Sequence, residues 1–105
     1  MADASAVLVA LADPTRRAIF ERVAATPSAV GELAHALPVS RPAVSQHLKV
    51  LKDAGLVRDR AEGTRRIYAV DRSGLDAVRD YFERFWRDSL AAFATAAEQS
   101  YEEER

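Results

Sequence analysis

The stretch VSRPAVSQHLKVLKDAGLV, residues 39–57, has the pattern of a short amphipathic helix closed by a glycine. A helix that opens at Ser40 places Val44, Leu48 and Leu51 on one side, at positions i, i+4 and i+7. The opposite side carries cationic and hydrogen-bonding side chains, namely Arg41, Ser45, Gln46, Lys49 and Lys52. An apolar face toward a core and a basic, amide-bearing face toward solvent suit a helix that lies in the major groove of DNA.

The segments around this helix predict one domain, residues 1–105, with the element order α-α-α-α-β-β-α. Apolar periodicity and turn residues place the elements. Helices are expected over about residues 3–11, 14–25, 29–37, 40–54 and 74–99, and strands over 56–61 and 64–70.

Capping residues support these boundaries. Asp13 is a candidate N-cap with Pro14 at the first helical position, and Ser28 and Ser40 are expected to cap the next two helices. Gly55 suits the left-handed end of the fourth helix, and Gly63 a turn between the strands.

Two helices joined by a tight turn and followed by a hairpin predict a winged helix-turn-helix, a mostly α fold with a small β-hairpin. Residues 29–54 form the helix-turn-helix and residues 56–70 the wing. The final helix carries aromatic side chains, including Tyr81 and Trp86, at helical spacing. They could line a ligand pocket, but helix-on-helix packing is the favoured interpretation, because a 105-residue chain has little core in which to bury them.

Charge is distributed unevenly along the chain. The net charge is −1, and no cysteine is present, which excludes disulfides, thiolate metal sites and cysteine nucleophiles. Residues 41–72 hold eight Arg or Lys against four acids, a local net of about +4, whereas residues 76–105 hold eight acids against four arginines, about −4. A basic middle and an acidic tail indicate that one surface meets phosphate.

The predicted wing is rich in arginine, with Arg58, Arg60, Arg65 and Arg66 on a hairpin of a few residues. Four such charges repel one another and call for an anion, and a DNA backbone would supply it. A solvated basic surface is the alternative, and it is weakened because the helix and the wing are basic together.

The chain resembles the ArsR-type family of small bacterial winged-helix repressors. The resemblance lies in LADPTRRAIFERV, GELAHALPVSRPAVSQHLKVLKDAGLV and EGTRRIYAVD, and covers about residues 8–71. Its most specific block is AVSQHLKVLKDAGLV. The resemblance implies a homodimer that binds a palindromic DNA operator, usually as a repressor.

Candidate site residues follow from the residue pattern together with this resemblance. The DNA-binding candidates are Ser40, Arg41, Pro42, Ser45, Gln46, Lys49, Arg60, Thr64, Arg65 and Arg66. The homodimer would be built on the first and last helices, residues 1–12 and 74–100. The dimer-interface candidates are Val7, Leu8, Leu11, Leu75, Val78, Phe82, Phe85, Trp86 and Phe93.

The chain departs from relatives that sense metals. Their sites use a cysteine pair or acid and histidine sets on the last helix, whereas this chain has HALPVSR in the first region and no histidine in the last helix. His35 and His47 lie on different helices without acid partners at ligand spacing, so packed or capping roles are expected. The chain therefore resembles the metal-independent branch, with no metal or cofactor expected and an unknown effector.

Two other functions are alternatives to DNA binding. A winged-helix module that binds protein instead of DNA would need an apolar or acidic outer face on the helix over 40–54, where the sequence is cationic. An enzyme is not expected, since no nucleophile–base pair, phosphate loop or metal set is found. The N-terminus lacks a signal-peptide pattern and no apolar run suits a membrane helix, so a cytoplasmic protein is expected.

Overall fold

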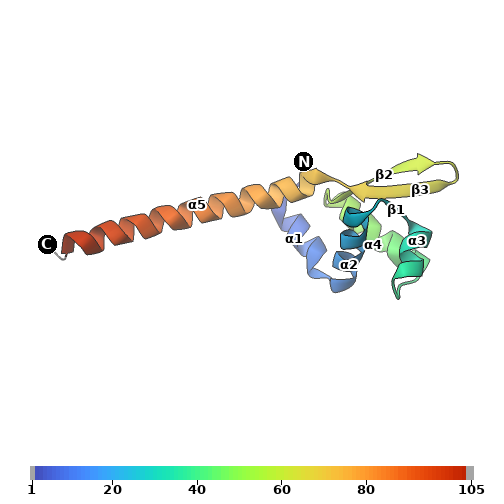
Figure 1. The fold of residues 1–105 in the computed structure, drawn as a ribbon, viewed down its shortest axis with the longest axis horizontal. Helices are drawn as coiled ribbons and strands as arrows, with labels where there is room; N and C mark the ends of the chain where they lie inside the picture. Colours follow the sequence, from blue (N-terminus) through green and yellow to red (C-terminus); the bar gives the residue numbers. More distant parts are fainter. Residues whose placement is uncertain (1, 104–105) are drawn as a thin grey trace.

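The structure, a computed structural model, describes residues 2–103. The elements are α1 (Ala4–Ala12), α2 (Pro14–Ala25), β1 (Ser28–Ala29), α3 (Val30–Ala36), α4 (Arg41–Asp53), β2 (Val57–Glu62), β3 (Arg65–Val70) and α5 (Arg72–Glu103). The predicted order α-α-α-α-β-β-α is confirmed, with the short strand β1 added. Figure 1 shows α5 projecting from a compact group formed by the other elements, and the described chain extends over 73 × 26 × 20 Å.

The core lies among α1, α2, α3, α4 and the base of the hairpin. The predicted stripe of α4 is confirmed, since Val44, Leu48 and Leu51 are buried, and α2 buries Ile19 and Val23. The remaining core residues are Val7, Ala10, Phe20, Leu33, Ala54, Leu56 and Val57. Their burial against one another supplies the main stabilising term, at about 25 cal/mol per Å² of apolar surface removed from water.

Helix caps form where the sequence predicts them in α2 and α4, and α5 has one as well. The Asp13 carboxylate accepts the Arg16 N–H at 2.9 Å, and that bond is the main reason why the pKa of Asp13 lies below its ordinary value. Ser40 Oγ accepts the Ala43 N–H at 3.3 Å, and Asp71 accepts the Ser73 N–H at 2.9 Å. These bonds satisfy donors that have no partner inside the helix.

The two predicted glycine conformations are also confirmed. Gly55 follows the end of α4 with a φ of 79°, and Gly63 lies in the hairpin turn with a φ of 62°. An L side chain rarely adopts this left-handed region, so each glycine permits the chain reversal that follows it.

The start of α3 differs from the prediction. Ser28 does not cap this helix: it belongs to β1, and its hydroxyl donates to the Thr26 carbonyl oxygen at 2.7 Å. The N-cap is Ala29, whose side chain has no acceptor, and the Ala29 N–H instead donates to Glu32 Oε1 at 2.9 Å. Glu32 thus provides the half of a capping box that reaches back from the third helical position.

The sheet has three strands in the order β1-β3-β2, and not the two strands of the predicted hairpin. β1 pairs antiparallel with β3, with Ala29 opposite Ile67. A strand of two residues has no alternating pattern to detect, and it forms here because β3 offers it a free edge. The hairpin register pairs Glu62 with Arg65 around the turn.

The last helix is longer than predicted, because α5 covers Arg72–Glu103 and not 74–99. At 1.5 Å per residue its 32 residues span about 48 Å. α1 packs against the beginning of α5, and the rest extends away from the other elements (Figure 1). Over the described residues, no helix is both long and apolar enough to cross a membrane.

Candidate nucleic-acid interface

The polar face of α4 is held outward by the burial of its opposite face. Val44, Leu48 and Leu51 have no exposed surface, so the helix cannot rotate without exposing them. The face that remains in solvent carries five of the predicted DNA-binding residues of α4, all of them exposed: Arg41, Pro42, Ser45, Gln46 and Lys49. Ser40, the sixth, is exposed as well, but its hydroxyl is engaged in the cap.

The wing, β2 and β3 with the turn between them, distributes its arginines over two faces. Because side chains alternate along a strand and directly paired residues share a face, Arg60 lies on the same side as Arg65. Arg66 lies on the other side, together with Asp59. The sequence suggested a single cluster of arginines, and the register divides it.

Carboxylates already neutralise most of this positive charge, contrary to the expectation that the wing needs an external anion. Three ion pairs involve wing arginines: Arg60 Nη2 to Glu62 Oε2 at 3.2 Å, Arg65 Nη2 to Glu32 Oε1 at 2.6 Å, and Arg66 Nη1 to Asp59 Oδ2 at 2.9 Å. On α4, Lys49 Nζ lies 3.5 Å from Asp53 Oδ2. DNA would therefore have to replace resident carboxylates.

Asp59 joins the wing to α4. Its side chain is only 9% exposed and contacts Lys52 Nζ at 2.8 Å as well as Arg66. The hydrogen bond from Lys52 holds the pKa of Asp59 below its ordinary value, although desolvation acts in the opposite direction. The same bond raises the pKa of Lys52. The carboxylate is thus kept ionised where the last turn of α4 meets β2 and β3.

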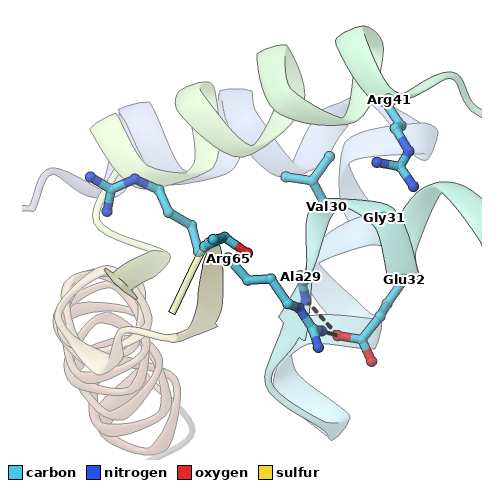
Figure 2. A pocket seen from close by; sticks show the side chains of 8 residues that line it. Ala29, Val30, Gly31, Glu32, Arg41 and Arg65 are labelled. Atoms are coloured by element: carbon cyan, nitrogen blue, oxygen red, sulfur yellow. Dashed lines mark hydrogen bonds and ion pairs between the residues drawn. The ribbon is translucent and has the colours of Figure 1, made fainter. Parts of the chain in front are cut away.

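A cavity of about 510 Å³ lies between the start of α3, the start of α4 and the wing tip. Its lining is Ala29, Val30, Gly31, Glu32, Arg41, Thr64, Arg65 and Arg66. Figure 2 shows Arg41 beside Gly31, and a Cβ built on Gly31 would lie 3.0 Å from Arg41 Nη2. The missing side chain of Gly31 therefore leaves room for the Arg41 guanidinium.

The structure brings some predicted DNA-binding residues together and leaves others apart. Arg41, Thr64, Arg65 and Arg66 line the same cavity although they come from α4 and the wing. Ser45, Gln46 and Lys49 lie further along α4, outside its lining.

Three residues of this surface were missed by the sequence analysis, namely Gly31, Glu32 and Asp59. Only Glu32 gave a local signal, as an acid in the third position of α3, and it would have been found had the cap been placed at Ala29.

An exposed apolar surface covers α1 and α5. Along α5 it includes Leu75, Tyr81, Phe82, Phe85, Trp86, Leu90 and Phe93. On α1 it includes Leu8 and Val9, and Val9 was not among the predicted residues. Single exposed apolar residues are ordinary, but a row of aromatic ones along a helix indicates an interaction surface.

Three of the predicted dimer-interface residues, Val7, Leu11 and Val78, are buried or partly buried and do not belong to this exposed apolar surface. Val7 has no exposed surface because it packs in the core of its own chain, so it offers no surface of its own to a second copy. Leu11 and Val78 are partly buried and pack against the same core. The exposed residues of α1, and not Val7, face outward.

The two histidines do not meet. His35 is exposed on α3, and His47 is half-buried on α4. Within residues 2–103, no three His, Cys, Asp or Glu side chains come together in a way that could hold a metal ion.

The fold and this surface define a winged helix-turn-helix protein, and comparison with known proteins places it more narrowly. Residues 11–60 match the family model described as a helix-turn-helix domain. The chain is 65% identical to the HTH-type transcriptional regulator Rv2034 of Mycobacterium tuberculosis over 85 aligned residues. The aligned residues make up 81% of this chain and 79% of that protein. The chain belongs to the ArsR/SmtB family of helix-turn-helix transcriptional regulators.

Solved structures agree with this assignment. An ArsR-like transcriptional regulator from Rhodococcus sp. RHA1 matches with a TM-score of 0.75 and 32% identity, over 89% of this chain and 91% of that one. The homodimeric winged helix-turn-helix DNA-binding domain of Mb0332 from Mycobacterium bovis matches with a TM-score of 0.60 and 32% identity, over 84% of this chain and 76% of that one.

Proposed function

We propose that this chain is a homodimeric repressor that binds a palindromic DNA operator. The observation that carries the proposal is the exposed face of α4, which is held outward by a fully buried apolar stripe. Arg41 and Gln46 are the side-chain types that pair bidentately with guanine and adenine in the major groove. Ser45 and Lys49 suit contacts with phosphate, which set the position of the helix along the duplex.

The wing supplies the second contact of the proposed complex. Thr64, Arg65 and Arg66 lie at its tip and line a cavity together with Arg41 of α4. When α4 lies in the major groove, the tip can reach the neighbouring backbone, where arginine contacts add affinity for every sequence. Arg60 on β2 would add to the same backbone contact.

Dimerisation would use the apolar surface on α1 and α5. Phe85, Trp86 and Phe93 are 60%, 65% and 72% exposed in one chain, and pairing with a second copy would remove them from water. The Mb0332 domain, a solved relative, is described as homodimeric. Two α4 helices in one dimer would read half-sites about ten base pairs apart, or a multiple of that spacing.

Control by a thiolate metal site is excluded for this chain, because it has no cysteine. We propose that it belongs to the metal-independent branch of the family. Its release from DNA stays open between a small molecule, a protein partner and autoregulation by its own concentration.

A gel-shift assay would test the proposal. It would compare a duplex from the region upstream of this chain's own gene with a shuffled duplex of the same length, at one salt concentration. We expect the upstream duplex to bind at least about 10³-fold more tightly. Equal affinity for the two duplexes would contradict sequence-specific repression. Absence of any binding at low salt would favour a winged-helix module that binds protein.

A further inference from the structure

Arg65 at the wing tip and Glu32 on α3 form the shortest ion pair of the described chain. Arg65 Nη2 lies 2.6 Å from Glu32 Oε1, and the same oxygen accepts the Ala29 N–H at 2.9 Å (Figure 2). The two side chains are 57% and 59% exposed, so the pair is open to solvent and to a large partner. It joins residues 33 positions apart in the sequence.

The Glu32 carboxylate is held in place by the backbone. Ala29, which donates to it, belongs to β1, and β1 is paired with β3, the strand on which Arg65 lies. Arg65 thus extends from β3, and Glu32 extends from the first turn of α3, where the Ala29 N–H ties its carboxylate to β1. The carboxylate occupies one wall of the cavity that Arg41, Arg65 and Arg66 also line.

A carboxylate and a phosphate present similar oxygen pairs to a guanidinium, and arginine binds both bidentately. We propose that Glu32 occupies on Arg65 the place that a DNA backbone phosphate takes in the complex. Binding then exchanges one anion for another, and Glu32 lowers the affinity of the wing for any duplex. This inference rests on the proposed function, because it assumes that the wing meets DNA.

The exchange has a consequence for salt dependence. When an arginine binds phosphate, the duplex releases about 0.9 of a condensed cation, which steepens the dependence of affinity on salt. The freed Glu32 carboxylate attracts a cation from solution, which offsets part of that release. The salt slope is the slope of log affinity against log salt concentration. The contact between Arg65 and phosphate should therefore steepen this slope less in the natural protein than in a variant without the Glu32 carboxylate.

The test is Glu32→Gln, measured on a short duplex of random sequence, because a backbone contact acts on every sequence. Glutamine removes the charge but keeps an oxygen that accepts the Ala29 N–H, so the start of α3 is preserved. We expect binding to tighten about 2- to 5-fold, the range of an exposed ion pair. Between about 50 mM and 200 mM salt, the dependence of log affinity on log salt concentration should steepen by less than about 0.9, since the carboxylate offsets only part of one phosphate contact.

Two further variants separate the exchange from general charge effects. Glu21→Gln makes the same change of charge on the exposed surface of α2, where Glu21 forms no ion pair within residues 2–103. It should leave the salt slope unchanged. Arg65→Gln should abolish the gain from Glu32→Gln, because no arginine remains to be freed. Thermal unfolding of each variant checks that the fold is kept.

The outcomes are distinct. If the natural protein binds DNA and Glu32→Gln binds equally or more weakly, Glu32 does not compete with phosphate and the inference is overturned. A gain that persists in the Arg65→Gln background, or that Glu21→Gln reproduces, overturns it as well, since general repulsion would then explain the effect. If the natural protein binds no duplex at low salt, the proposed function fails and the inference fails with it.

Discussion

The backbone of Gly74 at the start of α5 contacts the backbone of Gly55 just after α4. The Gly74 N–H donates to the Gly55 carbonyl oxygen at 2.8 Å, and Ser73 Oγ donates to the same oxygen at 3.2 Å. A Cβ on Gly74 would lie 2.7 Å from that oxygen. This contact sets the position of α5, which carries the exposed aromatic row, relative to α4, which carries the basic face.

Replacing Gly74 by alanine should separate these two helices and destabilise the protein. The new Cβ would collide with backbone atoms, which cannot move away as a flexible side chain can. We expect the free energy of unfolding to fall by about 1–3 kcal/mol, as in overpacked sites, measured by urea denaturation. The control is Gly63→Ala, where a Cβ meets nothing within 4 Å and only the backbone conformation is strained. A free energy of unfolding that is unchanged in Gly74→Ala would show that the close contact has no effect.

Replacing Gly31 by alanine should have opposite effects on stability and on DNA binding. Alanine is favoured over glycine in a helix by up to about 1 kcal/mol, and the Arg41 guanidinium, which the Cβ would crowd, can move because it is exposed. Stability should rise slightly while affinity for DNA falls, because Arg41 is displaced. Titration of the upstream duplex would measure this, and the loss should vanish in an Arg41→Ala background.

Replacing Asp59 by asparagine should weaken the connection between α4 and the wing. The carboxylate accepts from Lys52 and Arg66, and both partners are more than half exposed, so we expect a loss of about 1 kcal/mol near neutral pH. Because the folded-state pKa of Asp59 is lowered, this contribution is present above the unfolded value and is lost as pH falls below about 4. Urea denaturation at several pH values should show the two proteins converging in acid. A difference that does not change with pH would argue against the ion pairs.

Gln46→Ala and Arg65→Ala should affect DNA binding in different ways. Gln46, on the exposed face of α4, should select a base, so its loss should relax sequence preference at one position, at about 1–3 kcal/mol. Arg65 at the wing tip should contact the backbone, so its loss should weaken all duplexes alike. Binding to a set of single-base variants of the operator would distinguish them. If Arg65→Ala changed sequence preference and Gln46→Ala did not, the two assignments would be reversed.

Phe85→Glu should dissociate the proposed dimer. A charge placed among exposed aromatic side chains would be buried without a partner if two chains paired there. Sedimentation velocity should show a dimer for the natural protein and a monomer for the variant, and DNA binding should weaken because two linked helices bind more tightly than one. Arg84→Glu, which lies about 100° around α5 from Phe85 and outside the aromatic row, is the control and should remain dimeric.

Much of the fold could be predicted because it depends on neighbours in the sequence. Asp13 and Ser40 cap helices within three residues, and the stripe at Val44, Leu48 and Leu51 repeats with the helical period. Glycine at position 55 is recognised by its place after such a helix. Each of these features depends on a distance of a few residues, over which the chain has little conformational choice.

The sequence by itself thus determined the helices, the hairpin and the identity of the basic helix face, because short-range sterics and periodic burial leave few alternatives. Only the tertiary structure decided which partners those elements meet. It pairs Arg65 with Glu32, brings Gly74 onto Gly55, adds β1 to the sheet and places Val7 in the core of its own chain. These contacts join residues far apart in the sequence, and they form only when the packing of the whole core sets the distance between elements.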